Sequence, residues 1–252
     1  MLALTHVPSP QLDQGERTHV ARVPVDHERA VKQHDNYCRT LRGFGVEVRT
    51  LDCNKHLPDS VFIEDTAIVL DEVAVLASMG AESRRGEPAG IEPELRKHRV
   101  VERIEPPAYL EGGDVLQVDR KLLVGVSLRT NLAGLSALEA IVRRYGYAVT
   151  PIPVARCLHL KTACSALPDG ALLINPAWID AAAFPGFDLL HVGKMEPWAA
   201  NILSIGDRVC CQTSHPRTAD LIRQRGFEVE LIDLSEFAKA EGGISCLNIV
   251  LA

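Results

Sequence analysis

The feature that most constrains the fold of this chain is a repeated pattern of two short strands, a helix and a third strand. Two copies align closely, over residues 115–152 and 202–232. Each copy begins with two apolar runs joined by a tight turn and continues through an Arg-Thr pair into a segment with helical spacing. In the first copy, residues 127–130 are expected to cap this helix. Each copy then ends with a strand that follows a glycine and an aromatic residue. Such repetition indicates a fold built from similar units.

Parts of the same pattern recur elsewhere in the chain. Residues 65–77 are typical of two strands around an Asp-Glu turn, and residues 172–191 form a weaker copy. Residues 2–7 favour a short strand, residues 26–43 a helix that ends at glycines, and residues 46–51 a strand. Roughly five β-β-α-β units of about 30–50 residues therefore account for the chain.

Repeats of this length are typical of open solenoids and of closed propellers. An open array needs polar capping repeats at its ends, whereas this chain ends in an apolar run, residues 247–251. Closure into a ring, with the two terminal segments sharing one unit, fits that end better. Because no linker or low-complexity stretch interrupts the repeats, we predict a single α/β domain, residues 1–252.

Composition limits the functions that such a domain can have. Hydrophobic residues make up 46% of the chain and charged residues 24%, as in an ordinary soluble globular protein. The formal net charge of -6 argues against a general nucleic-acid-binding surface and gives no attraction to an anionic membrane. No apolar run approaches the roughly 18 residues of a membrane span. An acidic surface is compatible with a small cationic substrate.

The seven cysteines are an odd number and show no paired CXXC spacing. Most lie in apolar surroundings, which favours reduced thiols in a cytoplasmic protein over a disulfide framework. The N-terminal residues lack the basic and apolar regions of a signal peptide. Clustered ligands at short spacing are not found, so we expect no zinc site.

Polar residues stand just before the first strand of successive units. A closed ring would bring these positions together on its axis, because each unit delivers one loop there. The combination of a cysteine, a histidine and several carboxylates then predicts a Cys-His site that binds a cation. In chain order, the residues are Glu64 and Asp65, Glu111 and Asp114, His159, Asn201 and Cys246.

Cys246 follows a Gly-Gly pair and precedes an apolar strand. The glycines allow a tight turn that presents the thiol at the mouth of the strand, which is where a nucleophile is needed. A nearby cation lowers the pKa of such a thiol, and a histidine with a carboxylate on its other ring nitrogen can transfer protons near neutral pH. A buried structural cysteine in a C-terminal strand is the alternative.

The other residues also have ordinary structural interpretations. Glu64 and Asp65 resemble common acidic turn residues, and Glu111 begins a Glu-Gly-Gly-Asp sequence that is typical of a plain turn. His159 lies in an apolar run, where a lone histidine is more often a hydrogen-bonded core residue. Arg129 stands where a helix starts and could form a structural salt bridge. The equivalent positions of these residues in successive repeats favour the functional interpretation.

With these residues identified, the chain resembles the dimethylarginine dimethylaminohydrolases, which belong to the guanidino-group-modifying superfamily of arginine deiminases and amidinotransferases. The matching strings span nearly the whole chain in the family's order, so no single string carries the resemblance. They are PDSVFIED at 58–65, GAESRRGE at 80–87, EGGDV at 111–115, RTN at 129–131, LHLK at 158–161 and GGISC at 242–246.

The resemblance implies a five-bladed α/β propeller of the pentein type and hydrolysis of N-ω-methylated arginines, including asymmetric dimethylarginine and monomethylarginine, to citrulline and an alkylamine. Cys246 would attack the guanidinium carbon and form a covalent thiouronium intermediate. His159 would protonate the leaving amine and then activate water. Glu111 would orient His159 and, with Asp65, hold the guanidinium nitrogens.

For the remainder of the substrate, the resemblance implies that Arg84 and Arg129 hold the α-carboxylate and that Asp59 lies near the α-amino group, while Glu64 completes the substrate-binding set. No cofactor or metal is implied, because the substrate cation itself helps to stabilise the thiolate. Members of the family are often dimers, so a homodimer is expected. Cys157 lies two residues before His159 and would share its strand face toward the site.

One departure from the family pattern concerns the lid over the substrate. The family has a leucine just after the glycine that Gly15 matches, whereas Glu16 and Arg17 follow here. The preferred guanidine could therefore be arginine, agmatine or another guanidine hydrolysed by the same mechanism. An amidinotransferase fits less well, because such chains are generally longer. A non-catalytic propeller that binds cations remains an alternative of a different class.

Overall fold

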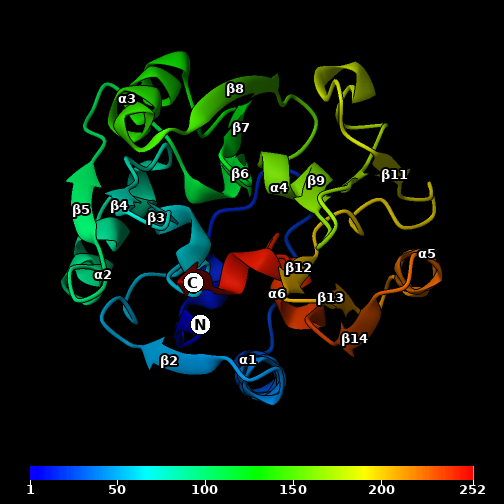
Figure 1. The fold of residues 1–252 in the computed structure, drawn as a ribbon. Helices are drawn as coiled ribbons and strands as arrows, with labels where there is room; N and C mark the ends of the chain where they lie inside the picture. Colours follow the sequence, from blue (N-terminus) through cyan, green and yellow to red (C-terminus); the bar gives the residue numbers. More distant parts are fainter. Residues whose placement is uncertain (252) are drawn as a thin grey trace.

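The computed structural model describes residues 1–251 and contains five three-stranded β-sheets arranged around a common centre (Figure 1). In each sheet the middle strand pairs antiparallel with one neighbour and parallel with the other. The sheets are β15 (Ile249–Leu251), β1 (Leu2–His6) and β2 (Glu47–Leu51); β3 (Ala67–Val69), β4 (Val73–Leu76) and β5 (Val100–Arg103); β6 (Val115–Val118), β7 (Lys121–Val126) and β8 (Ala148–Pro153); β9 (Cys164–Ala166), β10 (Leu172–Ile174) and β11 (Leu189–His191); and β12 (Leu203–Ile205), β13 (Arg208–Gln212) and β14 (Glu228–Ile232).

A helical segment connects the parallel strands of each sheet, because parallel neighbours require a crossover connection. Four of these segments are α-helices on the outer rim (Figure 1). The fourth unit, which the sequence predicts to be a weaker copy, has only a short 3-10 turn in this place. The segments are α1 (His27–Gly43), α2 (Glu87–Leu95), α3 (Leu132–Val142), η6 (Ala181–Ala183) and α5 (Pro216–Gln224).

The two ends of the chain share one sheet. β1 pairs antiparallel with β15, with Leu2 opposite Leu251, and pairs parallel with β2. The prediction that the terminal segments complete one unit together is confirmed. This arrangement places η7 (Ser245–Leu247), which carries Cys246 just before β15, next to the loops of the other units.

Helix α1 forms as its sequence predicts. The side chain of Asp26 caps the helix by accepting the amide N–H of Arg29, and residues at spacings of three and four face the interior. Beyond the helix Gly45 has φ of 79°, a left-handed conformation that costs glycine little. The buried residues are Ala30, Gln33, His34, Tyr37, Cys38 and Leu41.

Two details differ from the sequence-based expectation. The helix of the third unit is capped by Asn131, whose side chain accepts the amide of Gly134 at 2.8 Å, and not by residues 127–130. The second unit is also complete, because α2 and β5 follow its hairpin. Helix α2 has weak amphipathic character and contains Pro93, so its sequence gives little helical signal.

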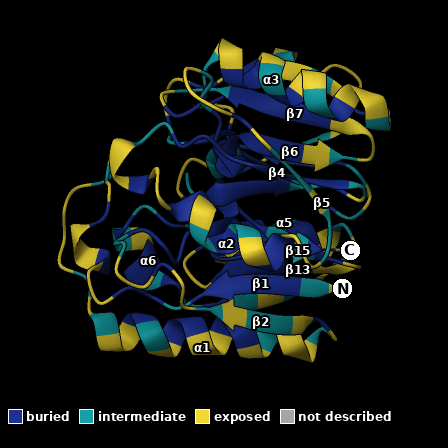
Figure 2. Cartoon of the chain, turned by 90° about the vertical axis from the view of Figure 1, so that its left-hand side faces the viewer, coloured by how far each residue is buried: buried dark blue, intermediate teal, exposed yellow. Residues whose placement is uncertain are grey.

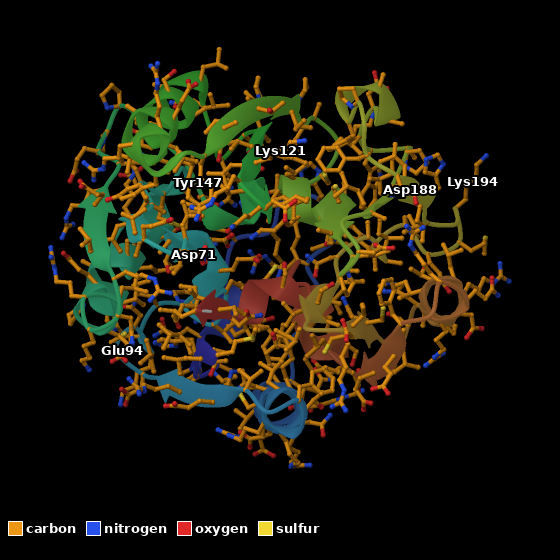
Figure 3. All side chains as sticks on the ribbon, viewed as in Figure 1. Asp71, Glu94, Lys121, Tyr147, Asp188 and Lys194 are labelled. Atoms are coloured by element: carbon orange, nitrogen blue, oxygen red, sulfur yellow. The ribbon has the colours of Figure 1, made fainter. Side chains whose placement is uncertain are left out.

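The apolar core is divided into separate clusters between neighbouring units. Figure 2 shows buried residues along the inner strands and exposed residues on the outward faces of α1 and α3. Ion pairs such as Arg225 with Asp188 and Arg49 with Glu94 lie toward the rim (Figure 3). Within residues 1–251 no helix combines the length and apolar character needed to cross a bilayer. Further short helical segments are η1 (Leu12–Gln14), η3 (Glu82–Arg84), η5 (Arg143–Tyr145) and α6 (Ser235–Lys239).

Candidate active site

Four short helical turns meet at the centre of the sheets, each just before the first strand of its unit. Hydrogen bonds join them: the amide of Gly113 donates to Oδ1 of Asp65 at 3.1 Å, and the amide of Leu160 donates to Oδ1 of Asp114 at 2.9 Å. The ring thus brings together the polar residues that the sequence places before successive hairpins. The turns are η2 (Ile63–Thr66), η4 (Gly112–Asp114), α4 (Leu160–Ala163) and η7 (Ser245–Leu247).

His159 is buried immediately before α4. Its Nε2 lies 2.8 Å from Oε2 of Glu111, and its Nδ1 lies 3.7 Å from Oδ1 of Asp65. Burial alone disfavours an imidazolium, but Asp65, Asp114 and Glu111 outweigh that effect and raise the pKa of His159 to about 9. The ring is therefore protonated at neutral pH and can donate a proton to a leaving group.

Glu111 is completely buried and its carboxylate is fixed from two sides. Oε1 accepts the amides of Gly80 at 3.0 Å and Ala81 at 3.3 Å, while Oε2 faces His159. Burial disfavours the carboxylate, yet the hydrogen bond and charge of His159 keep the pKa of Glu111 below its usual value. This geometry orients the imidazole and favours its charged form.

Gly113 is required for the close approach of Asp65 and His159. A Cβ at this position would lie 2.6 Å from both Oδ1 of Asp65 and Nδ1 of His159. Contacts this short between non-bonded atoms force one side chain to move. The Glu-Gly-Gly-Asp sequence is thus more than a plain turn, because its second glycine leaves space for two charged side chains.

Arg84 is buried among carboxylates. Its guanidinium donates to Oδ2 of Asp65 at 2.7 Å, to Oε2 of Glu87 at 2.8 Å and to the carbonyl of Phe62 at 3.0 Å. Burial disfavours a charged Asp65, but His159 and Arg84 lower the pKa of Asp65 below its usual value. Because Arg84 already contacts two carboxylates, it has little capacity left for a substrate carboxylate.

Arg129 has more donor capacity. Its Nη1 is buried, lies 3.6 Å from Oε1 of Glu111, and has no hydrogen-bond partner among residues 1–251. Asp59 is also buried, and burial raises the pKa of its carboxyl group. Oδ2 of Asp59 accepts the amide of Glu16 at 3.1 Å. An arginine donor and an acidic group are therefore available for the charged ends of an amino acid.

Glu64, which the resemblance places in the substrate-binding set, has other partners here. Its Oε1 lies 2.7 Å from Nζ of Lys161, and its Oε2 accepts the hydroxyl of Ser245 at 2.8 Å. The side chain of Asn201 donates to the carbonyl of Lys161 and to Oγ of Ser245, both at 2.9 Å, and accepts the amide of Ser245 at 3.1 Å. These contacts hold the loop before Cys246 against α4.

Cys246 is half-buried in η7, and the amide of Gly243 donates to its Sγ at 3.3 Å. Burial, with the carboxylates of Glu64 and Asp65, raises the pKa of the thiol far above its usual value. The thiol is therefore protonated at neutral pH when no ligand is bound. A cation placed beside Sγ would oppose the carboxylates and favour the thiolate.

Two cavities adjoin the centre. One of about 320 Å³ includes Cys246 in its wall, together with residues of the fourth and fifth units. The other, of about 460 Å³, is lined by Glu64, Lys161 and Ser245, and its wall does not include Cys246. Of these two cavities, the smaller one therefore adjoins the thiol.

The segment that contains Glu16 and Arg17 forms hydrogen bonds with other loops at both of its ends. The side chain of Ser83 donates to Oε1 of Glu16 at 2.5 Å. The amides of Thr18 and His19 donate to the two carboxylate oxygens of Glu241 at 2.6 and 2.9 Å. Residues 15–19 thus connect the region of Asp59 to the loop that carries Cys246.

Arg17 forms contacts that link residues within the same segment. Its side chain is almost completely buried, although it forms an ion pair with the exposed Asp13 at 3.1 Å. Nη1 also donates to the carbonyl of Val23 at 3.2 Å. The charged residue after Glu16 therefore holds residues 13–23 together.

Asp65, Glu111 and His159 each place one ligand atom within 4.8 Å of the others, an arrangement that could hold a metal ion. The same two carboxylates can accept hydrogen bonds from a planar organic cation. The donor set alone does not distinguish these ligands, but the adjacent cysteine and the protonated histidine favour covalent chemistry on an organic cation.

Several residues of the site were not assigned a role from the sequence. Asn201 was recognised by its position in the repeat, but its contacts with Ser245 could not be read from one chain. Lys161 belongs to a string that matches the family but was given no role, and Glu241 carried no signal beyond its charge. Cys157 is buried, donates from Sγ to the carbonyl of His159 at 3.3 Å, and is absent from the wall of the cavity beside Cys246.

The fold and the site together define an α/β protein of five repeated sheets with a Cys-His-carboxylate centre. The model of the eukaryotic N,N dimethylarginine dimethylhydrolase family matches residues 14–164. The N(G),N(G)-dimethylarginine dimethylaminohydrolase of Streptomyces coelicolor is 41% identical over 251 residues, which cover 99% of this chain and 96% of that relative. The enzyme of the same name from Pseudomonas aeruginosa is 34% identical over 226 residues, covering 89% of each chain. The protein belongs to the dimethylarginine dimethylaminohydrolase family.

Solved structures agree with this membership. The Pseudomonas aeruginosa enzyme, as a Cys-to-Ser variant complexed with citrulline, superposes with a TM-score of 0.92 at 31% identity and covers 98% of both chains. A dimethylarginine dimethylaminohydrolase adduct with S-methyl-L-thiocitrulline gives a TM-score of 0.93 with the same identity and coverage. The N-terminal domain of the cyanobacterial arginine dihydrolase ArgZ, at 23% identity and a TM-score of 0.87, shares the fold.

Proposed function

We propose that this protein hydrolyses N-ω-methylated arginines, including asymmetric dimethylarginine and monomethylarginine, to citrulline and an alkylamine. The observation that carries the proposal is the imidazolium of His159, held between Glu111 and Asp65. It lies in a chain 41% identical to an enzyme named for this reaction. The related structures with citrulline and S-methyl-L-thiocitrulline support the same substrate class.

In the first step, the substrate guanidinium lies against Asp65 and Glu111, and its positive charge lowers the pKa of the Cys246 thiol. The thiol proton leaves to solvent, and Sγ bonds to the guanidinium carbon. The bond from that carbon to the substituted nitrogen then breaks. His159 gives its proton to this nitrogen, which leaves as the amine, so that a cationic thiouronium remains on Cys246.

In the second step, neutral His159 takes a proton from water as the water oxygen attacks the thiouronium carbon. The bond from carbon to sulfur then breaks and the remaining proton of the added hydroxyl passes to solvent, which restores the thiolate and leaves the ureido group of citrulline. The departed amine takes up a proton from solvent to become the alkylammonium ion. Overall, one guanidinium and one water give one urea and one alkylammonium ion, so charge and atoms balance. Glu111 keeps the imidazole oriented through both proton transfers.

For the amino-acid end of the substrate, we assign the α-carboxylate to Arg129, whose Nη1 lacks a partner among residues 1–251. Asp59 lies near the α-amino group. Arg84 either donates its one remaining Nη1 hydrogen to the substrate α-carboxylate or contributes indirectly by holding Asp65 in place. Glu64 positions the loop of Cys246 through Ser245.

The proposed fold is the closed five-bladed pentein propeller, with each sheet as one blade. Support comes from the shared terminal sheet and from the likeness to the Pseudomonas aeruginosa enzyme. We further propose a cytoplasmic enzyme, which agrees with free thiols at all seven cysteines. A homodimer is proposed from the family alone, and analytical ultracentrifugation tests it.

The experiment that tests the function is a citrulline assay on the purified protein with dimethylarginine, monomethylarginine, arginine and agmatine in parallel. We expect turnover of the methylated arginines. Preferential turnover of arginine would retain the mechanism and reassign the substrate. No product from any of the four, with a folded protein, would reject the function.

A further inference from the structure

The cavity beside Cys246 contrasts with the carboxylates that are proposed to bind the guanidinium. Apart from Cys246, its wall lacks every residue that we assign to catalysis or to binding the amino-acid end. The cavity is lined instead by neutral or apolar side chains such as Val20, Pro197, Trp198 and Ala238. This space is therefore not where the guanidinium or the amino-acid end of the substrate is proposed to bind, and it remains for another group near the reacting carbon.

The two acidic residues in this wall already have partners. The carboxylate of Glu196 accepts the amides of Arg217 and Thr218 at 2.9 and 2.8 Å, and also the hydroxyl of Thr218. Glu241 accepts two amides from residues 18–19. The one histidine of the wall, His215, is buried, and burial lowers its pKa, so that it is neutral. No arginine or lysine lines the cavity, so a substrate carboxylate has no cationic partner there.

The cavity also lies close to the backbone of the proposed proton donor, His159. Thr162 is part of its wall, and the Thr162 hydroxyl accepts the amide of His159 at 3.4 Å. The cavity thus borders both the attacking Sγ of Cys246 and the backbone at His159, which makes it a candidate space for the substituent on the departing nitrogen. The volume of about 320 Å³ lies within the range of roughly 300–1,000 Å³ of small-molecule sites. This is far more room than one or two methyl groups fill.

We propose that this cavity is a subsite for the substituent on the departing nitrogen, and that the enzyme therefore also hydrolyses arginines with longer N-ω-alkyl or arylmethyl groups. The inference rests on the proposed function and extends its substrate class. The reaction is the same, with the larger amine as leaving group. Each turnover yields one citrulline and one alkylammonium or arylmethylammonium ion.

Filling the cavity tests the proposal. Ala238 lies in the wall with an exposed side chain, so Ala238→Trp adds volume without disturbing the core. Ala140, an exposed alanine of helix α3 that does not line the cavity, provides the matched control Ala140→Trp. Ser214→Trp, at another exposed wall position, serves as a second filling variant if the first does not fold.

The assay compares kcat/KM for citrulline release from N-ω-methyl-, N-ω-butyl- and N-ω-benzyl-arginine. For the wild type, we expect butyl and benzyl substrates within about tenfold of the methyl substrate. The filling variant should lower kcat/KM for the two larger substrates at least about tenfold more than for the methyl substrate, since steric discrimination in pockets is commonly of this size. Ala140→Trp should leave the ratios unchanged.

Two outcomes would overturn the inference alone: a wild type that hydrolyses monomethylarginine but rejects both larger substrates, or a filling variant that affects all three substrates equally. Absence of citrulline from monomethylarginine as well would reject the proposed function, and the subsite with it.

Discussion

Two regions near Cys246 differ in their charged groups. In one region, loops of the second, third and fourth units hold Asp65, Glu111 and the imidazolium of His159 in direct contact. In the other region, residues of the fourth and fifth units form a cavity without arginine or lysine, in which the two carboxylates are hydrogen-bonded to backbone amides. The repeat thus supplies a similar backbone scaffold at each position. The side chains around each loop decide whether that position holds a cluster of charged groups or borders a cavity.

The thiol near both regions should give the largest effect. Cys246→Ser removes the nucleophile, and we expect citrulline formation to fall by more than about 10³-fold. The half-buried position should leave the fold intact. Cys53→Ser, at an exposed cysteine, is the matched control and should retain activity. Appreciable turnover by Cys246→Ser would mean that neither region is the reaction centre.

Glu111→Gln tests the region of charged groups. Loss of this carboxylate should lower kcat about 10²–10³-fold, because general acid catalysis contributes roughly this much. In the wild type, kcat/KM should fall as pH rises through about 9, where His159 loses its proton. The variant removes one of the groups that raise this pKa, so its alkaline limb should move to lower pH. A pH-rate profile measures both effects.

The control for this carboxylate is Glu105→Gln, at an exposed glutamate. Its pH-rate profile should match that of the wild type. An unchanged alkaline limb in Glu111→Gln would show that His159 does not set the pH dependence.

Gly113→Ala tests whether the arrangement of Asp65 and His159 requires a residue without a side chain at position 113. The added Cβ would lie 2.6 Å from Asp65 and from His159, so we expect a loss in kcat/KM of about 10²-fold, as for a misplacement of about 1 Å. Gly193→Ala is a matched control, because a Cβ there meets no atom within 4 Å. Equal activity of the two variants would contradict the close packing of Asp65 and His159.

Arg129→Ala separates recognition of the amino-acid end from the chemistry. Loss of a charge-assisted hydrogen bond of about 1.5–3 kcal/mol should reduce kcat/KM for dimethylarginine roughly 10–150-fold, mainly through KM. Any turnover of agmatine, which has no carboxylate, should change less. Steady-state kinetics with both substrates provide the measurement, and equal losses would argue for a structural role of Arg129.

Glu241→Gln should give the smallest effect. Glu241 has φ of 63° and accepts two amides from residues 18–19. The amide retains one acceptor oxygen and loses the charge, so we expect KM to rise roughly two- to tenfold, in line with one weakened charged hydrogen bond. Hydrogen exchange of residues 15–23 should accelerate. Glu230→Gln, on strand β14, is the control, and unchanged exchange in Glu241→Gln would contradict the tether.

Much of the fold could be predicted from the sequence, because the repeat is visible in local patterns. Turns and apolar alternation located the hairpins of three units, and Asp26 with Gly45 marked the ends of α1. The helix of the second unit was missed, since Pro93 and weak amphipathic character hide it. The cap of α3 was misplaced, because Asn131 follows directly after several other polar residues.

The sequence by itself determined the residue types of the site, their order and their recurrence before successive strands, and hence the chemistry they can perform. Only the tertiary structure decided their partners. It paired Arg84 with Asp65 and Glu87, and turned Glu64 toward Lys161 and Ser245. The physical reason is that hydrogen bonds and ion pairs depend on atoms a few ångströms apart, whereas these residues are separated by up to 181 positions in the chain.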